Sequence, residues 1–329
     1  MRRSGLSLIL ALLLFPFGLV QASFAQDATP AASGLADLGL PTLDVTVSAA
    51  GFEGIPESLE AGRYLVTITA AEDTGEFGGS VAFVQPSGVS ADEFLGMLAG
   101  PPPDASGGDS ASPVVDAEAT PAEDGSEAGG PPAALFEATF AGGTFAVPRQ
   151  SAAIVLDLPP GEWIAWADDP EASQEPIIFE VTGEMPVDLA EPESSATLTM
   201  GEYVIKLTEG ELSAGPQVLK IENIGAQPHF VFGSPGPDDL TEEQVGVALE
   251  EEMAAEGTGT PPAYSDFNPD EDLSFDAGFF SGTQSTGTTV WLSVNFEAGT
   301  YAMACFFPDL GDGMPHAYKG MYTVVEVGE

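Results

Sequence analysis

Residues 58–68 read SLEAGRYLVTI, and residues 211–221 read ELSAGPQVLKI. Each segment is a turn followed by a strand-like run in which apolar and polar residues alternate. The likeness continues along the chain, because each segment is followed by a short apolar run that ends near a proline, at Pro86 and at Pro235. The sequence therefore predicts that one structural unit occurs twice.

A capping-box pattern follows each apolar run. Ser90 stands three residues before Glu93 in the first copy, and Thr241 stands three residues before Gln244 in the second. In such a pair each side chain binds a backbone N–H group that the first turn of a helix leaves free. Each copy is therefore predicted to contain one short helix.

Two polar segments interrupt the copies after these helices. Residues 100–132 and residues 256–272 are rich in Pro, Gly, Ala, Asp and Glu, and are predicted to be disordered insertions. After its insertion each copy closes with a strand, a turn at Gly161 or Gly299, and a hairpin-like end. Short alternating strands with few helices predict an all-β fold class with two tandem β-sandwiches, over residues 43–184 and 196–329. These ranges are called the first copy and the second copy.

The start of the chain has the pattern of a signal peptide over residues 1–25. Met1-Arg2-Arg3 precedes an apolar run from Leu6 to Val20, and Ala25 offers a small residue at the expected cleavage site. This run is shorter than the roughly 20 residues that span a bilayer, so no stable membrane insertion is expected. The sequence predicts a secreted protein whose residues 26–42 form a flexible linker.

The charge of the chain is strongly one-sided. There are 52 acidic residues against 7 basic ones, with a formal net charge of −45. Nucleic acid is excluded as a partner, because binding phosphates requires clustered Lys and Arg. The acidic surface has two interpretations: it is a solvated face, which we favour, or it steers a basic partner toward the protein.

Three residues of rare types need an explanation. The chain has one cysteine, Cys305, and two histidines, His229 and His316. A single cysteine makes no internal disulfide, so its role lies elsewhere. A buried cysteine and a histidine at the end of a strand are each ordinary structural features when they are taken singly.

All three residues lie in three short segments of the second copy. Residues 223–232 read NIGAQPHFVF, residues 298–308 read AGTYAMACFFP, and residues 313–321 read GMPHAYKGM. The second copy thereby resembles the cupredoxin family, the plastocyanin and azurin group, whose fold is a Greek-key β-sandwich. The first copy resembles this fold more weakly, through the repeat, and is interpreted as a degenerate cupredoxin-like unit.

The resemblance implies one type 1 (blue) copper site in the second copy. In it His229, Cys305 and His316 are the strong ligands, and Met321 is the weak axial ligand. A thiolate with two neutral imidazoles suits both Cu(I) and Cu(II), and a distant thioether adjusts the potential.

Two features of the second copy depart from the family pattern. Ten residues separate Cys305 from His316, and Phe230 follows the first histidine where the family often has a small polar residue.

Alignment of the copies places Ser80 opposite His229 and Ala167 opposite Cys305, so the first copy has no copper ligands. Trp163 and Trp166 of the first copy could dock a partner, but we interpret them as core residues.

The predicted function is that of a secreted blue copper protein that exchanges electrons with a redox partner, for which a basic protein would suit. The alternatives are a metal-free extracellular binding or structural module, and a copper storage or delivery protein. No enzyme is expected and no catalytic residue is assigned. Multicopper oxidases and nitrite reductases need further histidines, and no Gly-x-Ser-x-Gly motif precedes a helix.

Overall fold

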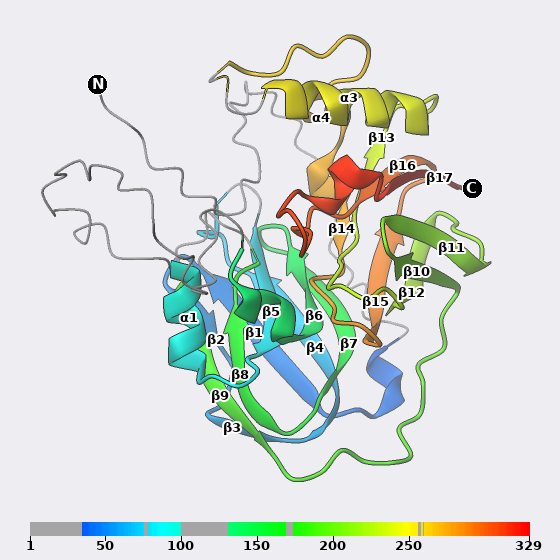
Figure 1. The fold of residues 1–329 in the computed structure, drawn as a ribbon. Coiled ribbons are helices and arrows are strands. Elements are labelled where there is room, and N and C mark those ends of the chain that lie inside the picture. Colours follow the sequence, from blue (N-terminus) through cyan, green and yellow to red (C-terminus); the bar gives the residue numbers. More distant parts are fainter. Residues whose placement is uncertain (1–34, 76–77, 100–130, 169–173, 256–257, 259) are drawn as a thin grey trace, which may run out of the picture.

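A computed structural model describes residues 35–75, 78–99, 131–168, 174–255, 258 and 260–329. The predicted signal peptide and most of the insertion at residues 100–132 lie outside these ranges. The described chain is mostly β with few helices (Figure 1).

The first copy contains nine strands and two short α-helices in its described residues. Their bounds are β1 Thr42–Ser48, β2 Gly51–Glu53, β3 Ser58–Glu60, β4 Gly62–Ala70, β5 Gly79–Gln85, α1 Ala91–Ala99, α2 Ala133–Glu137, β6 Thr139–Ala146, β7 Ser151–Leu158, β8 Gly161–Trp166 and β9 Ile177–Thr182. A 3₁₀ turn, η2, precedes them at Ala36–Leu38.

The second copy follows with a similar order of elements. Their bounds are β10 Ala196–Gly201, β11 Val204–Gly210, β12 Gly215–Asn223, β13 Phe232–Gly236, α3 Glu242–Ala255, α4 Pro269–Asp272, η4 Phe275–Ala277, β14 Phe279–Phe280, β15 Thr289–Phe296, β16 Gly299–Ala304, η5 His316–Lys319 and β17 Tyr322–Val327.

Both predicted capping boxes are present. The backbone N–H of Ser90 donates to Glu93 at 3.0 Å, and the backbone N–H of Thr241 donates to Gln244 at 3.0 Å. The glycine turns also correspond, because Gly161 and Gly299 start matching strands with φ values of 144° and 142°. Such a φ strains any residue with a Cβ, which explains a glycine at each turn.

The two copies share one sheet. It has eight strands in the order β11-β10-β12-β15-β7-β4-β1-β2, and the copies meet where β15 pairs with β7 through Trp291 with Val155 and Leu292 with Ile154. Each copy has a second sheet of its own, β3-β9-β8-β5-β6 in the first and β14-β13-β16-β17 in the second. The sandwiches are therefore joined edge to edge, which leaves neither β7 nor β15 as an open edge.

One apolar cluster extends through both copies. In the first copy Ile68 and Ile154 of the shared sheet pack in the same cluster as Trp163 of the opposite sheet. In the second copy Ile221 belongs to this cluster together with Tyr301. Trp163 is fully buried, so its interpretation as a core residue is confirmed.

The side chain of Arg63 makes contacts on both sides of the junction between the copies. Its guanidinium makes a two-pronged ion pair with Asp157, at 2.7 and 2.9 Å, and lies 4.4 Å from the ring centre of Trp291 in the second copy. A third hydrogen bond reaches the carbonyl of Ala190, in the connection between the copies. A buried arginine is stable only when its donors are satisfied in this way.

Two segments with a disordered composition contain folded residues. Leu35, within the predicted linker 26–42, is fully buried and packs in one cluster with Leu65 and Trp291. Within residues 256–272, Phe267 is buried and α4 forms a short turn capped by Asn268. In both cases a few apolar side chains in a polar segment find a surface on the sandwiches to pack against.

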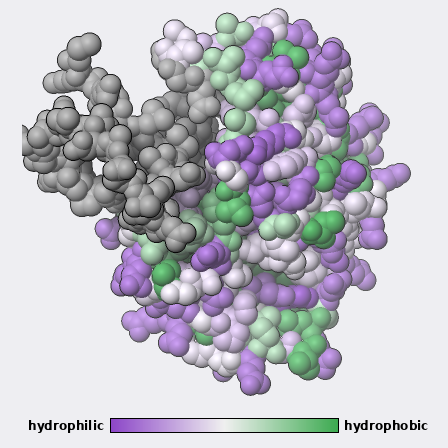
Figure 2. All heavy atoms as spheres, viewed as in Figure 1, coloured by the Kyte–Doolittle hydropathy of each residue, from purple (hydrophilic) through white to green (hydrophobic). Residues whose placement is uncertain are grey.

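The surface is largely hydrophilic on the face shown in Figure 2. None of the helices in the described ranges is long and apolar enough to cross a membrane.

Candidate metal centre

The four predicted ligands lie in the loops and strand ends beside β13, β16 and β17. His229 stands three residues before β13, Cys305 directly follows β16, His316 opens η5, and Met321 directly precedes β17. All four are completely buried.

Three ligand atoms converge on one point. His229 Nδ1 and His316 Nδ1 are 3.0 Å apart, and Cys305 Sγ lies 3.9 Å from the first and 3.7 Å from the second. These residues form the one group of three or more potential metal ligands found among the described residues.

A single metal ion fits this triangle. Zinc, as a typical example, binds histidine nitrogen at about 2.0–2.1 Å and cysteine sulfur at about 2.3 Å, and one ion at these lengths bridges atoms 3 to 4 Å apart. Two imidazoles and a thiolate in a trigonal arrangement are the donor set of a type 1 copper site. The residues present therefore fit copper.

The backbone connects Met321 to the other ligands. The N–H of Met321 donates to the carbonyl of His316 at 3.0 Å, and the N–H of Cys305 donates to the carbonyl of Met321 at 3.1 Å. Cys305, His316 and Met321 thus belong to one short hydrogen-bonded unit.

The long interval between Cys305 and His316 does not separate these ligands. The two ends of this loop pair with each other. The N–H of His316 donates to the carbonyl of Phe307 at 2.9 Å, and Pro308 and Pro315 form an isolated antiparallel β-bridge. Within it the N–H of Asp309 donates to the carbonyl of Met314 at 2.9 Å. The extra residues form a small hairpin that returns the chain to the site.

The surroundings of the sulfur act on its thiolate form in two opposite ways. Burial raises the pKa of the Cys305 thiol to about 12, so the thiolate is costly without a cation beside it. The backbone N–H of Phe230 lies 3.5 Å from Cys305 Sγ and donates to it. Phe230 therefore supports the sulfur through its backbone, while its ring packs against Phe280 at 5.3 Å.

Both histidines are held in the neutral form that a metal needs. Burial lowers the pKa of His229, although Glu202 partly offsets the effect. Burial, together with the neighbouring His229, lowers the pKa of His316 to about 4. A neutral imidazole offers a lone pair to a cation, whereas a protonated one does not.

Asn223 and Gln284 fix the backbone around His229. His229 and Gln284 exchange backbone hydrogen bonds of 3.0 and 2.7 Å, and the Asn223 side chain donates to the carbonyl of Gln284 at 2.7 Å. Asn223 is part of the quoted NIGAQPH motif, but Gln284 was not predicted. Its segment has no distinctive sequence pattern, and only the fold brings it to the site.

The first copy also contacts the site, which was not predicted. Phe307, two residues after Cys305, packs edge-on against Phe136 and Phe140 of the first copy, with ring centres 5.8 and 5.9 Å apart. Phe307 in turn lies 6.1 Å from the ring of His316. The copy without ligands therefore supplies part of the apolar packing around the metal ligands.

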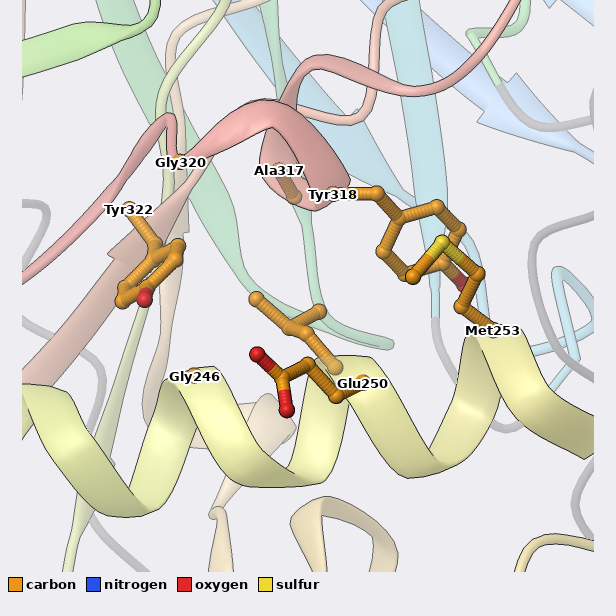
Figure 3. A pocket seen from close by; sticks show the side chains of 8 residues that line it. Gly246, Glu250, Met253, Ala317, Tyr318, Gly320 and Tyr322 are labelled. Carbon is orange, nitrogen blue, oxygen red and sulfur yellow. The ribbon is translucent and has the colours of Figure 1, made fainter.

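Helix α3 covers the segment that holds His316 and Met321. Val245, Ala248 and Leu249 are buried at helical spacing and pack with Ala317. Figure 3 shows a pocket between this helix and the segment, with Tyr318, Met253 and Glu250 around it. The pocket does not include any of the four ligands.

Strand register corrects the alignment of the copies by one residue. Ala82 pairs with Trp166 in the first copy and Phe232 pairs with Ala304 in the second, and Trp166 and Ala304 both lie five residues after the turn glycine. Gly79, rather than Ser80, therefore stands at the level of His229. Ala167 remains opposite Cys305, so the first copy still offers no ligand there.

Several solved structures are similar to parts of this chain. An auracyanin from Roseiflexus castenholzii is 19% identical over 40% of this chain and 95% of its own length, with a TM-score of 0.25. Auracyanin A from Chloroflexus aurantiacus, described as a blue copper protein, is 20% identical over 40% and 98%, with a TM-score of 0.24. A copper nitrite reductase from Nitrosomonas europaea is 9% identical over 88% and 94%, with a TM-score of 0.21.

Neither the scan against protein-family models nor the search of curated proteins gives a match. The assignment rests on the strand order, the motif and the ligand geometry of this chain. The described chain is mostly β, with two sandwiches that share one sheet, and its C-terminal part carries a single buried His–Cys–His–Met group of the kind that binds type 1 copper.

Proposed function

We propose that this protein is a secreted blue copper protein that binds one copper ion at His229, Cys305, His316 and Met321 and transfers electrons. The observation that carries the proposal is the convergence of two imidazole nitrogens and one thiol sulfur within 3.0 to 3.9 Å of one another. Copper at this point would supply a one-electron step between Cu(I) and Cu(II).

The protein's part is to hold the ligands in one arrangement for both oxidation states. All four residues are fully buried, and backbone hydrogen bonds join Cys305, His316 and Met321. Two imidazoles, a thiolate and a weakly bound thioether would suit both Cu(I) and Cu(II), so little rearrangement would accompany electron transfer.

Electron transfer fits this site better than catalysis. The two imidazoles are fully buried, which keeps water and substrates away from the coordination position. Among the described residues there is no second group of potential metal ligands where a substrate could be reduced or oxidised. We therefore propose a carrier rather than an enzyme.

The partner is proposed to be a redox protein that approaches the end of the molecule near the ligands. Ile224 and Leu310, from the loops before His229 and His316, are 69% and 59% exposed. A net charge of −45 on the chain would favour a partner with basic residues around its own contact face.

The test is the visible spectrum of the purified mature protein loaded with Cu(II). We expect an intense thiolate-to-copper absorption that ascorbate bleaches and a mild oxidant restores. Cys305→Ala should remove this absorption, whereas Met303→Leu, which changes a buried sulfur on the preceding strand β16 outside the ligand group, should keep it. Absence of the absorption from the wild-type protein would refute the proposal.

A further inference from the structure

The outer edges of the two imidazoles lack partners. His229 Nε2 and His316 Nε2 are buried, and neither has a hydrogen-bond partner within ordinary distance. A neutral imidazole that gives its Nδ1 lone pair to a metal carries its proton on Nε2. Both Nε2–H groups would then be buried donors that need acceptors.

A carboxylate faces each of these edges. Glu202 Oε1 lies 3.5 Å from His229 Nε2, and Asp309 Oδ2 lies 3.9 Å from His316 Nε2. Both distances exceed the usual range of 2.7–3.2 Å for N–H···O bonds, but they leave no room for another atom between the partners.

Glu202 is fixed in place by the loop that leads to His229. Its Oε1 accepts the backbone N–H groups of Ala226 at 2.5 Å and Gln227 at 3.1 Å, and its Oε2 accepts the side-chain amide of Gln227 at 3.0 Å. Gly225 makes this approach possible. A Cβ at this position would lie 2.6 Å from His229 Nε2 and 2.8 Å from Glu202 Oε1.

Asp309 is held still more firmly. It is 4% exposed, and its carboxylate accepts hydrogen bonds from Tyr203 Oη at 2.5 Å, Lys319 Nζ at 2.8 Å and Gln227 Nε2 at 3.0 Å. The N–H of Gly311 adds a fourth bond at 2.8 Å. Side chains from both ligand loops thus position one buried carboxylate beside His316.

Glu202 and Tyr203 together form the turn between β10 and β11, which lies against both histidines. Tyr203 adopts a positive φ of 55°, which is uncommon for a residue with a side chain. Its ring meets the ring of His316 edge-on, with centres 5.5 Å apart, and its hydroxyl binds Asp309. This turn therefore delivers one carboxylate directly and anchors the other.

We propose that Glu202 and Asp309 are positioning residues that accept the Nε2–H groups of His229 and His316 when the metal is bound. By this contact they select the tautomer whose Nδ1 lone pairs face the metal. A carboxylate on the far side of a ligating imidazole also makes that imidazole a stronger donor. The inference rests on the proposed copper function and adds two residues to its site.

The two carboxylates should favour Cu(II) over Cu(I). More basic imidazoles and nearby negative charge stabilise the more highly charged ion by a larger amount. Removing one carboxylate charge should therefore weaken Cu(II) binding more than Cu(I) binding and shift the reduction potential upward.

The experiment compares Glu202→Gln with Glu326→Gln in the full-length mature protein. Both variants remove one negative charge with little change of shape, but Glu326 is exposed on β17 and its carboxylate has no role in the site. Cu(II) and Cu(I) affinities are measured by competition with chelators, and the potential by redox titration. We expect Glu202→Gln to lower Cu(II) affinity by about 10- to 100-fold and to raise the potential, with Glu326→Gln close to wild type.

Asp309→Asn provides a second, independent test through His316. It should shift affinity and potential in the same directions, but it also breaks the contacts with Lys319 and Tyr203, so Glu202→Gln remains decisive if this variant does not fold. Equal affinities and potentials in Glu202→Gln and Glu326→Gln would overturn the inference. Failure of the wild-type protein to bind copper would instead refute the proposed function.

Discussion

The two copies use matching strands for different purposes at one end of the sandwich. In the second copy, β16 leads to Cys305, whose sulfur lies within 3.9 Å of two buried histidine nitrogens. In the first copy, β8 ends in Trp166, whose ring lies 6.2 Å from Phe94 and 6.3 Å from Phe140. In the first copy, aromatic side chains therefore pack at the end of the strand that corresponds to the one before Cys305.

This difference shows that similar sandwiches can occur with and without a group of metal ligands. Both copies keep the turn glycine, the capped helix and the buried aromatic residue two positions after the turn, Trp163 or Tyr301. These features stabilise the sandwich whether or not a metal is present. The first copy keeps a role at the site, because Phe136 and Phe140 pack against Phe307 beside His316.

The largest expected effect tests whether the copies unfold together. Trp163→Ala and Tyr301→Ala each remove a fully buried aromatic side chain, which should cost about 3–5 kcal/mol of unfolding free energy. Because β7 and β15 join the copies in one sheet, each variant should shift a single denaturation transition of the whole molecule. Ile178→Ala, at a partly exposed site on β9, should change the stability far less.

That expectation is checked by urea denaturation followed by fluorescence and circular dichroism. Two separate transitions, with only one shifted by each substitution, would show that the copies are independent units despite the shared sheet.

A smaller effect concerns how stability depends on the protonation of histidine. It distinguishes the copies, because the first copy contains no histidine. The pKa of His316 is about 4 in the folded protein and is about 6.5 in an unfolded chain. Between these values the unfolded chain binds a proton that the folded protein does not, so stability falls as pH decreases from 6.5 to 4. Above pH 6.5 this residue has no such effect.

His316→Gln removes this contribution, which is on the order of 3 kcal/mol across the window. The metal-free variant should therefore lose less stability than the metal-free wild type between pH 7 and pH 4.5. Identical losses in urea denaturation at the two pH values would mean that the buried histidine does not resist protonation as its surroundings indicate. Glu202, Asp309 and Lys319 near the ring are unchanged in both proteins.

The smallest effect tests the equivalence of the two turns. Gly161→Ala and Gly299→Ala each place a Cβ at a φ near +143°, with a strain of about 1–3 kcal/mol. Gly161→Ala also displaces the amide of Gln85, which donates to the carbonyl of Pro160 at 3.0 Å. Its cost should exceed that of Gly299→Ala by about 1 kcal/mol or less. A neutral effect at either glycine in thermal unfolding would argue against a shared turn.

Much of the fold could be predicted from local sequence. Alternating strands, two capping boxes and two turn glycines lie within short segments and repeat in the same order. The pairing of Ile154 and Val155 with Leu292 and Trp291 could not be predicted, because apolar residues at a strand edge do not specify their partner. A one-residue shift in β5 likewise escaped the alignment that placed Ser80 opposite His229.

The ligands could be predicted because their residue types are rare in this chain. Two histidines and one cysteine all fall on one motif, and the structure brings the three together. Glu202 and Asp309 could not be singled out, since they are 2 of 52 acidic residues and acquire their place only through folding. The support from Phe140 was also hidden, because it comes from the other copy.

The most direct test of the central claim is the number of copper ions that the protein binds. Native mass spectrometry of the purified protein, after loading with Cu(II) and removal of loosely bound metal, should show one copper per chain. Cys305→Ala should show none, and Ala167→Cys should still show one, because the first copy lacks the histidines. A wild-type protein with no copper, or with two, would contradict this account.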